Sequence, residues 1–525
     1  MGERILSSVH PRGQRNASMK VAIVVTAANE AQAESCQKEL DGRKDLADFL
    51  CLAVADPAGC RIGSGGGTLN ALVAAHDAIA GPHSQTCDWL DEHLVCVVHS
   101  GGDSQRSPSQ SVCGKAWSTL PLFGGRSGGE LAAPFDLLVD QLLALCAGCT
   151  GGCVVACSDV LLHLPTLVEG ALAAGRGVTG LAVSADGARY GPKHGVYVAG
   201  GGDAAAVGGA ACANFLQKAS MGALEAAGAV DGRGEVALDS GVLYVDAPTS
   251  KALLKLCTDD GGALRSATSR GAAGGCARVE LYSDVLNAVS GGGYDDFPTY
   301  AAMKADEADP AKVRRFREAL WAALRPVELR VHRPPGARFA HLGTTAEYMD
   351  LLTLPSLFRE PFGLRRFARN AAPPGCLVDD GADAWSVALN SVISKPSTLA
   401  AKAVVEHSRV DSLDGLGAGS LLSCCRGLPA DFSLDAKTML QQVQLLDGSF
   451  VALLFGVADD VKAPFEQATF LGRPWADALE RWGAAAGDLW AGEPGSLWTA
   501  KLFAPAPTGA AAARLSAGLQ ASSGD

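Results

Sequence analysis

Two glycine-rich segments carry the groups best suited to binding a phosphate. The first begins as an apolar run, VCVVH, and continues through Gly101, Gly102, Ser104, Arg106 and Lys115. Glycines let the backbone approach a phosphate closely, and the N–H groups of such a turn form an anion-binding concavity. Arg106 and Lys115 supply positive charge. The spacing fits neither the Walker pattern GxxxxGK(S/T) nor GxGxxG, and a plain turn is the alternative in a chain with 63 glycines.

The second segment, DPAGCRIGSGGGTLNAL, leads from an apolar run into a predicted helix. Backbone amides at a helix N-terminus favour negative charge, so this segment is the second candidate phosphate site. A flexible linker is the alternative, which the flanking apolar segments disfavour. The candidate ligand-binding residues here are Arg61, Gly63, Ser64, Gly65, Thr68 and Asn70.

Apolar runs alternate with helical patterns between Val21 and Ser158 and would position both segments. Strands are predicted at 21–26, 50–56, 95–99 and 153–158, with helices at 29–40, 68–79 and 136–146 between them. Continuous apolar strands alternating with helices predict an α/β fold, a mostly parallel sheet covered on both faces. Ligands bind such sheets at the carboxyl ends of the strands, where both glycine-rich segments fall.

The pattern of apolar and polar residues changes after the proline-containing stretches at 333–335 and 371–375. Short apolar runs separated by turn residues follow, including SVALNSVIS, AVVEHSRV and SLLSCCRG. They predict many short strands, as in a β-solenoid, although no exact repeat period is evident. We therefore predict an extension at 1–20, an α/β domain at 21–370, a solenoid at 371–505 and a loose tail at 506–525.

Composition and charge exclude several classes of protein. With 525 residues, a net charge of −12 and 19% charged residues, the chain is expected to be globular and not to bind nucleic acid. No apolar stretch approaches the roughly 20 residues of a membrane span. The segment before Val21 lacks the apolar core of a secretory signal. We expect a cytoplasmic protein without a membrane partner.

Sixteen cysteines are spread through apolar and Gly/Ala-rich contexts. In a chain of this length that distribution predicts reduced, buried thiols rather than a disulfide framework. The cluster at Cys146, Cys149, Cys153 and Cys157 leaves a zinc or redox role open, but cysteines in a core are the favoured interpretation.

Together with VVTAANEAQAESCQKEL and the closing RPWADAL and SLWTAKLF, the two glycine-rich segments resemble the fucose pyrophosphorylase family. The resemblance covers residues from about 20 to 505. The family includes fucose-1-phosphate guanylyltransferases and the N-terminal region of bifunctional fucokinase/GDP-fucose pyrophosphorylases. Membership would imply a nucleotidyltransferase-like α/β domain followed by a left-handed β-helix-like domain. It would also imply transfer of guanylate from GTP to L-fucose 1-phosphate, with Mg²⁺ as the cofactor.

The resemblance also suggests roles for individual residues. Arg106 and Lys115 would neutralise the phosphates, with help from Arg61, and Asp159, at the end of an apolar strand, would bind the metal. A helix N-cap is the alternative for Asp159. Asp284 is a weaker candidate for a second metal ligand; Glu280 competes with it, and a solvated helix face explains both equally well.

Four further residues are candidates for binding the sugar phosphate. Lys193 and His194 precede a predicted strand, and a structural role for His194 is the alternative. Asp239 and Gly241 stand where the family carries a D-T/S-G element near the sugar. A turn between strands explains the last pair equally well.

Two other functions remain open from the sequence. Relatives of the fucokinase type phosphorylate fucose with a downstream kinase domain, and only DGLGAGSLLS, at 414–423, weakly matches a loop of that domain. We expect no kinase domain here, because the match falls in the predicted solenoid. The other alternative is a non-catalytic scaffold. A separate fucokinase or a second copy of the chain are the partners left open.

Overall fold

The computed structural model describes residues 20–123, 130–173, 175–259, 262–270, 276–305, 307, 309–354, 359–373, 385–492 and 495–521. Its contacts divide the chain into two compact units with separate hydrophobic cores. The sheet unit holds the described residues up to Gly102 and those between Pro134 and Phe339. The coil unit holds those between Asp103 and Ala133 and those from Ala340 onward.

This division differs from the predicted boundary at residue 370. Residues 103–133 and 340–370 pack with the coils and not with the sheet. The Gln441 side chain, for example, donates to the backbone oxygen of Ser109 at 2.8 Å, and Trp385 N–H donates to Thr353 O at 2.7 Å. Such long-range contacts leave no local mark in the sequence.

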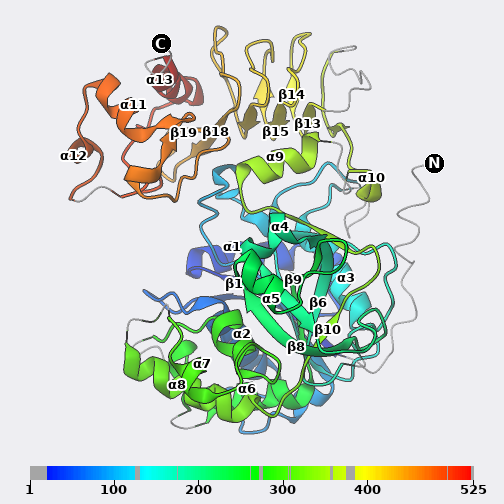
Figure 1. Cartoon of the computed structure of the whole chain (residues 1–525). Helices are drawn as coiled ribbons and strands as arrows, with labels where there is room; N and C mark the ends of the chain where they lie inside the picture. Colours follow the sequence, from blue (N-terminus) through cyan, green and yellow to red (C-terminus); the bar gives the residue numbers. More distant parts are fainter. Residues whose placement is uncertain are drawn as a thin grey trace. The chain divides into compact units, whose positions relative to one another are not determined.

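The sheet unit is built on one nine-stranded sheet with the order β2-β1-β3-β4-β9-β6-β10-β8-β7 (Figure 1). The strands β1 (Lys20–Ala27), β2 (Leu50–Ala55), β3 (His93–His99) and β4 (Gly152–Cys157) are parallel neighbours, as predicted. Only β8 and β9 run against the other strands of this sheet. The remaining strands are β6 (Val178–Asp186), β7 (Gly195–Ala199), β8 (Ala210–Gln217), β9 (Glu235–Val245) and β10 (Leu329–His332).

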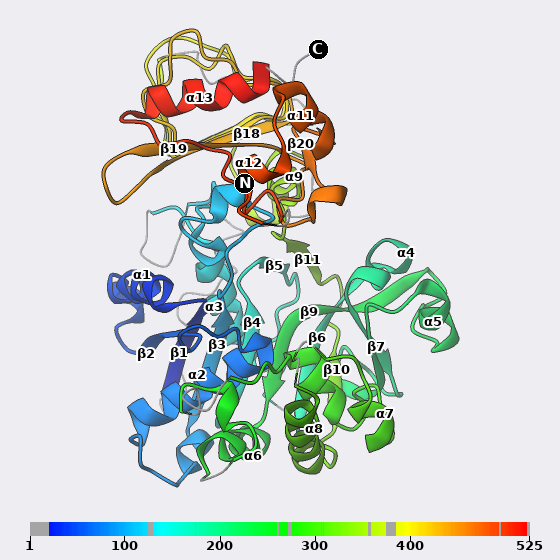
Figure 2. The same ribbon diagram turned by 90° about the vertical axis from the view of Figure 1, so that its left-hand side faces the viewer.

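Helices cover both faces of the parallel strands, as Figure 2 shows. On one face lie α1 (Glu30–Asp41) and α3 (Pro134–Leu145), where Arg43 and Asp136 form a buried ion pair. On the other lie α2 (Gly63–Ile79) and α6 (Ala247–Thr258), which share a core with strand residues such as Val95. The expectation of a parallel sheet covered on both faces is met in this half of the sheet.

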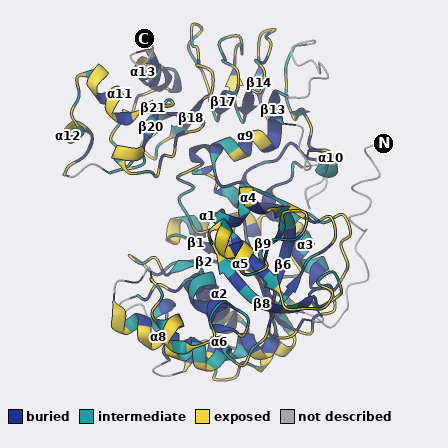
Figure 3. Ribbon diagram, in the orientation of Figure 1, coloured by how far each residue is buried: buried dark blue, intermediate teal, exposed yellow. Residues whose placement is uncertain are grey.

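The helix α2 begins before its predicted start. The expected start was Thr68, but the helix starts at Gly63 and includes the whole glycine run. Most of its residues are buried, whereas α8 (Pro310–Leu324) exposes one side to solvent (Figure 3). Tertiary packing therefore overrides the low helix propensity of glycine at this point.

Shorter elements complete the sheet unit. They are β5 (Val160–His163), α4 (Gly187–Tyr190), α5 (Met221–Ala226), a π-turn at Leu281–Val285, α7 (Phe297–Ala301) and β11 (Arg338–His341), whose last residues belong to the coil unit.

Short parallel strands form the coil unit. The strands β12 (Phe367–Ala368), β13 (Val387–Leu389), β15 (Val404–Glu406), β17 (Leu421–Ser423) and β18 (Thr438–Gln444) pair in parallel, and β19 (Phe450–Gly456) closes the sheet antiparallel to β18. A second ladder joins β14 (Val392–Ile393) to β16 (Arg409–Val410). The other elements are α9 (Thr345–Thr353), α10 (Arg359–Phe362), β20 (Thr469–Phe470), β21 (Arg473–Pro474), α11 (Trp475–Trp482), α12 (Ala486–Leu489) and α13 (Gly509–Ala521).

The coils have a regular step that the sequence analysis missed. Val387 pairs with Val404, and Val404 pairs with Leu421 at the same step along the sequence. Asn390, His407 and Cys424 recur at this step too, and they adopt φ angles of 46°, 50° and 55°. A left-handed residue follows each of these three-residue strands and turns the chain at the corner of a coil. This weak pattern was present in the sequence, but three different residue types occupy the corner.

Three expectations fall at the ends of the chain or on its cysteines. The predicted loose tail contains α13, where Ser516 Oγ donates to Ala452 O at 2.5 Å; residues 522–525 and 1–19 lie outside the described part. Cys60 and Cys276 form a disulfide, so the expectation of reduced thiols is wrong for this pair. Cys146, Cys149 and Cys153 are buried free thiols.

Among the helices of the described residues, none has the length and apolar composition of a membrane span.

Candidate active site

The carboxyl ends of β1, β3 and β4 lie side by side at one edge of the sheet. From β1 the chain goes to β2 on one side and later to β3 on the other, so the gap between β1 and β3 is a topological switch point. Ser158 N–H, just after β4, donates to His99 O at the end of β3 at 3.0 Å. Open α/β sheets bind ligands at such a point, and the first glycine-rich segment follows β3 there.

The turn after β3, Ser100–Gly102, is tied to β1 and α1. Ser100 N–H donates to Thr26 Oγ1 at 3.3 Å, and Gln32 Nε2 donates to Gly102 O at 3.3 Å. A Cβ atom on Gly101 would lie 3.2 Å from the carbonyl carbon of Ala27. A side chain at 101 would thus crowd β1, whereas a Cβ on Gly102 would meet open space.

The second glycine-rich segment contacts its own chain. A Cβ on Gly63 would come within 2.5 Å of Val279 O, and one on Gly65 within 2.9 Å of the Glu280 carbonyl carbon. Ser64 Oγ donates to a carboxylate oxygen of Glu280 at 2.8 Å, and Ser64 N–H donates to the same oxygen at 3.3 Å. At Gly63, Ser64 and Gly65 the carboxylate of Glu280 thus lies where the sequence predicts a phosphate.

Thr68 and Asn70 are also engaged within the protein. Thr68 Oγ1 donates to Ser64 O at 3.0 Å and lies 2.9 Å from His99 Nε2. Asn70 Nδ2 donates to Ala55 O at 3.0 Å, and its oxygen accepts Ser269 N–H at 2.9 Å. Both side chains are buried, and their bonds within the protein hold α2 in place.

Arg61 stands at the start of this segment, next to the Cys60–Cys276 disulfide. Its guanidinium lies 3.9 Å from the Asp56 carboxylate, which follows β2. Burial raises the pKa of Asp56 to about 6, although Arg61 opposes the shift. The side chain of Arg61 is about half exposed.

Asp159 follows β4, Asp239 and Gly241 lie in the middle of β9, and both carboxylates act on Tyr282. Tyr197 donates to Asp239 Oδ1 at 2.8 Å, and burial raises the pKa of Asp239 to about 6. Gly241 has a φ of 80°, and its Cβ would lie 3.6 Å from Cys157 Sγ. Burial raises the pKa of Tyr282 well above its ordinary value, and Asp239 and Asp159 add to this effect.

Lys193 and His194 directly precede β7, the strand that carries Tyr197. Lys193 is exposed, and the ring of His194 lies 5.5 Å from Phe339 and 6.4 Å from Tyr190. Because Val196 pairs with Leu238 in antiparallel register, β7 begins beside Asp239. Two of the four predicted sugar-phosphate residues thus lie within β9, and the other two directly precede its partner strand β7.

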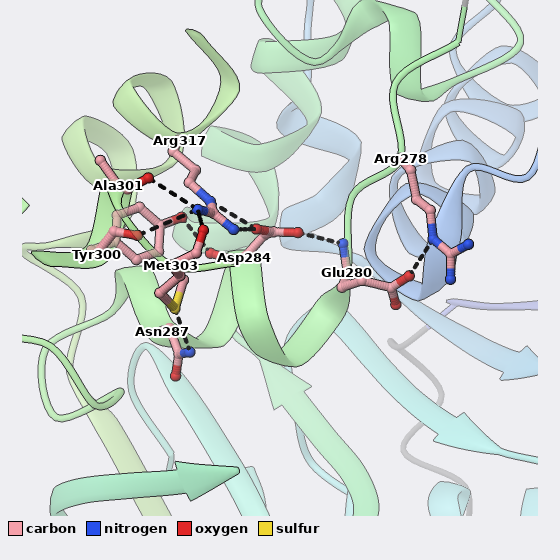
Figure 4. A network of polar contacts seen from close by, with 8 residues as sticks. All are labelled: Arg278, Glu280, Asp284, Asn287, Tyr300, Ala301, Met303 and Arg317. Atoms are coloured by element: carbon pink, nitrogen blue, oxygen red, sulfur yellow. Dashed lines mark hydrogen bonds and ion pairs between the residues drawn. The ribbon is translucent and has the colours of Figure 1, made fainter. Parts of the chain in front are cut away.

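The Asp284 carboxylate is bound by Arg317 and by the backbone of Glu280 (Figure 4). Arg317 Nε and Nη2 donate to Asp284 Oδ1 at 3.0 and 2.9 Å, and Glu280 N–H donates to Oδ2 at 2.8 Å. Arg317 also donates to the backbone oxygens of Ala301 and Met303. Asp284 and Arg317 are buried together, so this predicted candidate ligand forms a structural ion pair that fixes α8.

Ser104, Arg106 and Lys115 belong to the coil unit. Ser104 adopts a φ of 50°, and its backbone oxygen accepts Ser107 N–H at 2.7 Å. Arg106 has an exposed side chain, and its backbone oxygen accepts Thr345 N–H at 3.0 Å. Lys115 Nζ donates to Gly343 O at 3.2 Å. These contacts fold the basic segment against the start of α9.

Sequence reasoning missed His99, Tyr197 and Tyr282 and gave Glu280 the wrong role. A polar residue that closes an apolar run directly before Ser-Gly-Gly was a signal for His99. No local signal marked the other three, because their partners lie far away in the sequence. Within the part of the chain that the structure describes, no three His, Cys, Asp or Glu side chains are grouped as metal ligands.

Comparison with known proteins agrees with these features. The model of the fucose pyrophosphorylase domain matches residues 87–508, which include the turn after β3, Asp159 and Asp239. The chain belongs to this family. A human protein named fucose-1-phosphate guanylyltransferase is 24% identical over 92% of this chain and 81% of its own length. A bifunctional fucokinase/GDP-fucose pyrophosphorylase of Arabidopsis thaliana is 26% identical over 92% of this chain and 46% of its length.

Among solved structures, a UTP-bound UGPase from Acinetobacter baumannii aligns with 63% of this chain and over 91% of its own length. Its identity is 8% and its TM-score 0.23, too low for the likeness to add to the fold described above.

The buried ion pair predicts a large loss of stability on substitution. Asp284→Asn would leave Arg317 buried without a counter-charge and lower the unfolding free energy by about 3–5 kcal/mol. Urea denaturation measures this loss. The control Glu318→Gln, in an exposed pair with Arg314, should change it by less than about 1 kcal/mol. An Asp284→Asn protein as stable as the wild type but inactive would return Asp284 to the candidate ligands.

The raised pKa of Asp239 predicts a pH-dependent difference between the wild type and Asp239→Asn. The folded carboxyl titrates at about 6 and the unfolded one near 3.8, so the folded state binds the extra proton between these values. Stability of the wild type relative to the variant should therefore fall by about 2 kcal/mol as pH rises from 4 to 7. Denaturation of both proteins across this range tests it, and a constant difference would show that Asp239 is not perturbed.

Proposed function

We propose that the chain transfers guanylate from GTP to L-fucose 1-phosphate, releasing pyrophosphate and forming GDP-L-fucose. One observation carries the proposal. The family match takes in the turn after β3, together with the carboxylates that end β4 and lie on β9, and these elements meet at the switch-point edge of the sheet. The name of the human relative supplies the nucleotide transfer and the sugar.

The reaction calls for positioning and charge neutralisation. An oxygen of the sugar phosphate attacks the α-phosphorus of GTP in line, the new P–O bond forms, and the bond to pyrophosphate breaks. No covalent nucleophile is needed. The N–H groups of Gly101 and Gly102 would bind phosphate oxygens, and Arg106, Lys115 and Arg61 would neutralise their charge.

The residues present fit a Mg²⁺ ion that is shared with the substrate. Mg²⁺ commonly binds through one or two carboxylates and the phosphates of its nucleotide, and so needs no cage of protein ligands. Asp159, a partly exposed carboxylate directly after β4, is the side chain that would hold it. Bound there, the ion would supply charge neutralisation at the reacting phosphate.

The sugar phosphate would be bound by the two strands that carry Asp239 and Tyr197. Lys193 and His194 would contact its phosphate, while Asp239 and Gly241 would face the sugar. For the coil unit we propose the left-handed β-helix that the family resemblance implies. The weak kinase match lies in these coils, where Gly417 N–H donates to Leu434 O and Gly415 O accepts Leu434 N–H. Nothing in this arrangement favours kinase chemistry.

Purified protein with Mg²⁺ should release pyrophosphate from GTP and fucose 1-phosphate, and much less from ATP or UTP. A coupled pyrophosphate assay that crosses the three nucleotides with the sugar phosphate measures this. Free fucose with ATP and detection of ADP is run in parallel. ADP formation would show a kinase, and faster turnover with UTP or ATP would contradict the assignment of the base.

Two substitutions test the site. Lys115→Ala and Asp159→Asn should each lower kcat/KM by at least about 100-fold, because each removes a charge that stabilises the transferring phosphate. The controls Lys38→Ala and Asp41→Asn, on exposed positions of α1, should keep full activity. Circular dichroism and thermal unfolding confirm that all four variants fold. Full activity of both site variants would reject the assignment.

A further inference from the structure

His99 connects three elements of the candidate site. It ends β3, it pairs with Thr26 of β1 in the parallel register, and its ring contacts α2. A Cβ on Gly67 of α2 would lie 3.2 Å from His99 Cε1, so the ring packs closely against the helix at this glycine. His99 also accepts Ser158 N–H through its backbone oxygen, next to Asp159. The proposed phosphate transfer does not itself use this side chain.

The hydrogen bonds around the ring are all satisfied by one neutral tautomer. Thr68 has one hydroxyl hydrogen and donates it to Ser64 O at 3.0 Å. His99 Nε2, 2.9 Å from the same hydroxyl oxygen, must then be the donor. A neutral imidazole carries one N–H, so Nδ1 accepts from Thr26 Oγ1 at 3.2 Å. The Thr26 oxygen in turn accepts Ser100 N–H at 3.3 Å.

These bonds form one directional chain from the turn after β3 to the first turn of α2. In this tautomer every hydroxyl donates its one hydrogen and accepts through its oxygen, so no polar group of the chain is left unpaired. The neutral ring that the chain requires agrees with the surroundings. Burial lowers the pKa of His99 to about 4, although the nearby carboxylate of Glu280 opposes the shift.

We propose that His99 is a positioning residue that holds the phosphate-binding turn Ser100–Gly102 in register with α2 through Thr26 and Thr68. It does not touch the substrate. Its neutral Nε2–H tautomer fixes the Thr26 hydroxyl, which holds the Ser100 amide and thereby aims the next two N–H groups. This inference rests on the proposed function only for the identity of the ligand; the coupling between α2 and the turn stands on the geometry.

The first test measures the coupling without any assay of activity. Hydrogen–deuterium exchange of the amides in residues 96–104 is compared between the wild type and Thr68→Val, a variant of nearly the same shape on α2. Loss of the anchor should speed exchange at the turn by about tenfold, the factor expected for one broken hydrogen bond. Gly67→Ala, which pushes on the ring but removes no bond, should act in the same direction. Unchanged exchange in both variants would overturn the proposal.

The second test separates positioning from general loss of stability. If the turn binds GTP phosphates, Thr68→Val should raise KM for GTP about tenfold and change kcat little, because the lost contact is made equally in the ground and transition states. His99→Gln, which keeps one acceptor and one donor, should restore most of the function that His99→Leu loses. A fall in kcat with unchanged KM, or equal loss in both His99 variants, would count against it.

A double-mutant cycle completes the test. Thr26 and Thr68 do not bond each other, so without His99 as intermediary their effects should multiply. The proposal expects Thr26→Val with Thr68→Val to be about as impaired as either alone. If the wild type shows no turnover with GTP and fucose 1-phosphate, the proposed function fails. The exchange measurements then still decide the role of His99.

Discussion

The register between β1 and β3 is the constraint on which the site depends. In this parallel pair Thr26 lies beside His99, and His99 lies beside Cys157 of β4. A slip of one residue would turn every side chain of a strand to the other face of the sheet. Thr26 would then face away from the imidazole, and the Ser100 amide would lose its anchor. The apolar residues buried on both faces, such as Ile23 and Val97, hold the register.

The glycine run of α2 allows a second close contact, between the start of this helix and residues 277–281. Residues 277–281 lie against the first turns of the helix, where Gly66 N–H donates to Val279 O at 2.9 Å and Ser64 contacts Glu280. Side chains at 63, 65 and 66 would collide with this segment or with the helix start. The run therefore meets a packing demand, and the helix N-terminus receives its negative charge from Glu280 rather than from a ligand.

Residues 277–281, which lie against α2, are themselves fixed by contacts with the residues that follow them and with α8. Glu280 N–H is bound by Asp284, whose charge is neutralised by Arg317 from α8 (Figure 4). The Cys60–Cys276 disulfide joins the chain just before α2 to the chain just before residues 277–281. These contacts fix residues 277–281 beside α2, although the two segments are far apart in the sequence. Glu280 and Asp284, which resemble metal ligands in the sequence, make these contacts and so have structural partners.

The sequence by itself determined the local elements and the edge of the sheet where the site lies. Strands and helices around β1 to β4 were predictable because their apolar periodicity is a local property, and the Gly-Gly turn and Asp159 stand out because they directly follow such strands. The family was evident from the same motifs. What only the tertiary structure decided is which polar groups are already satisfied. Ser64, Thr68, Asn70 and Asp284 have the residue types of ligands, but burial beside partners from other elements turned them into internal bonds.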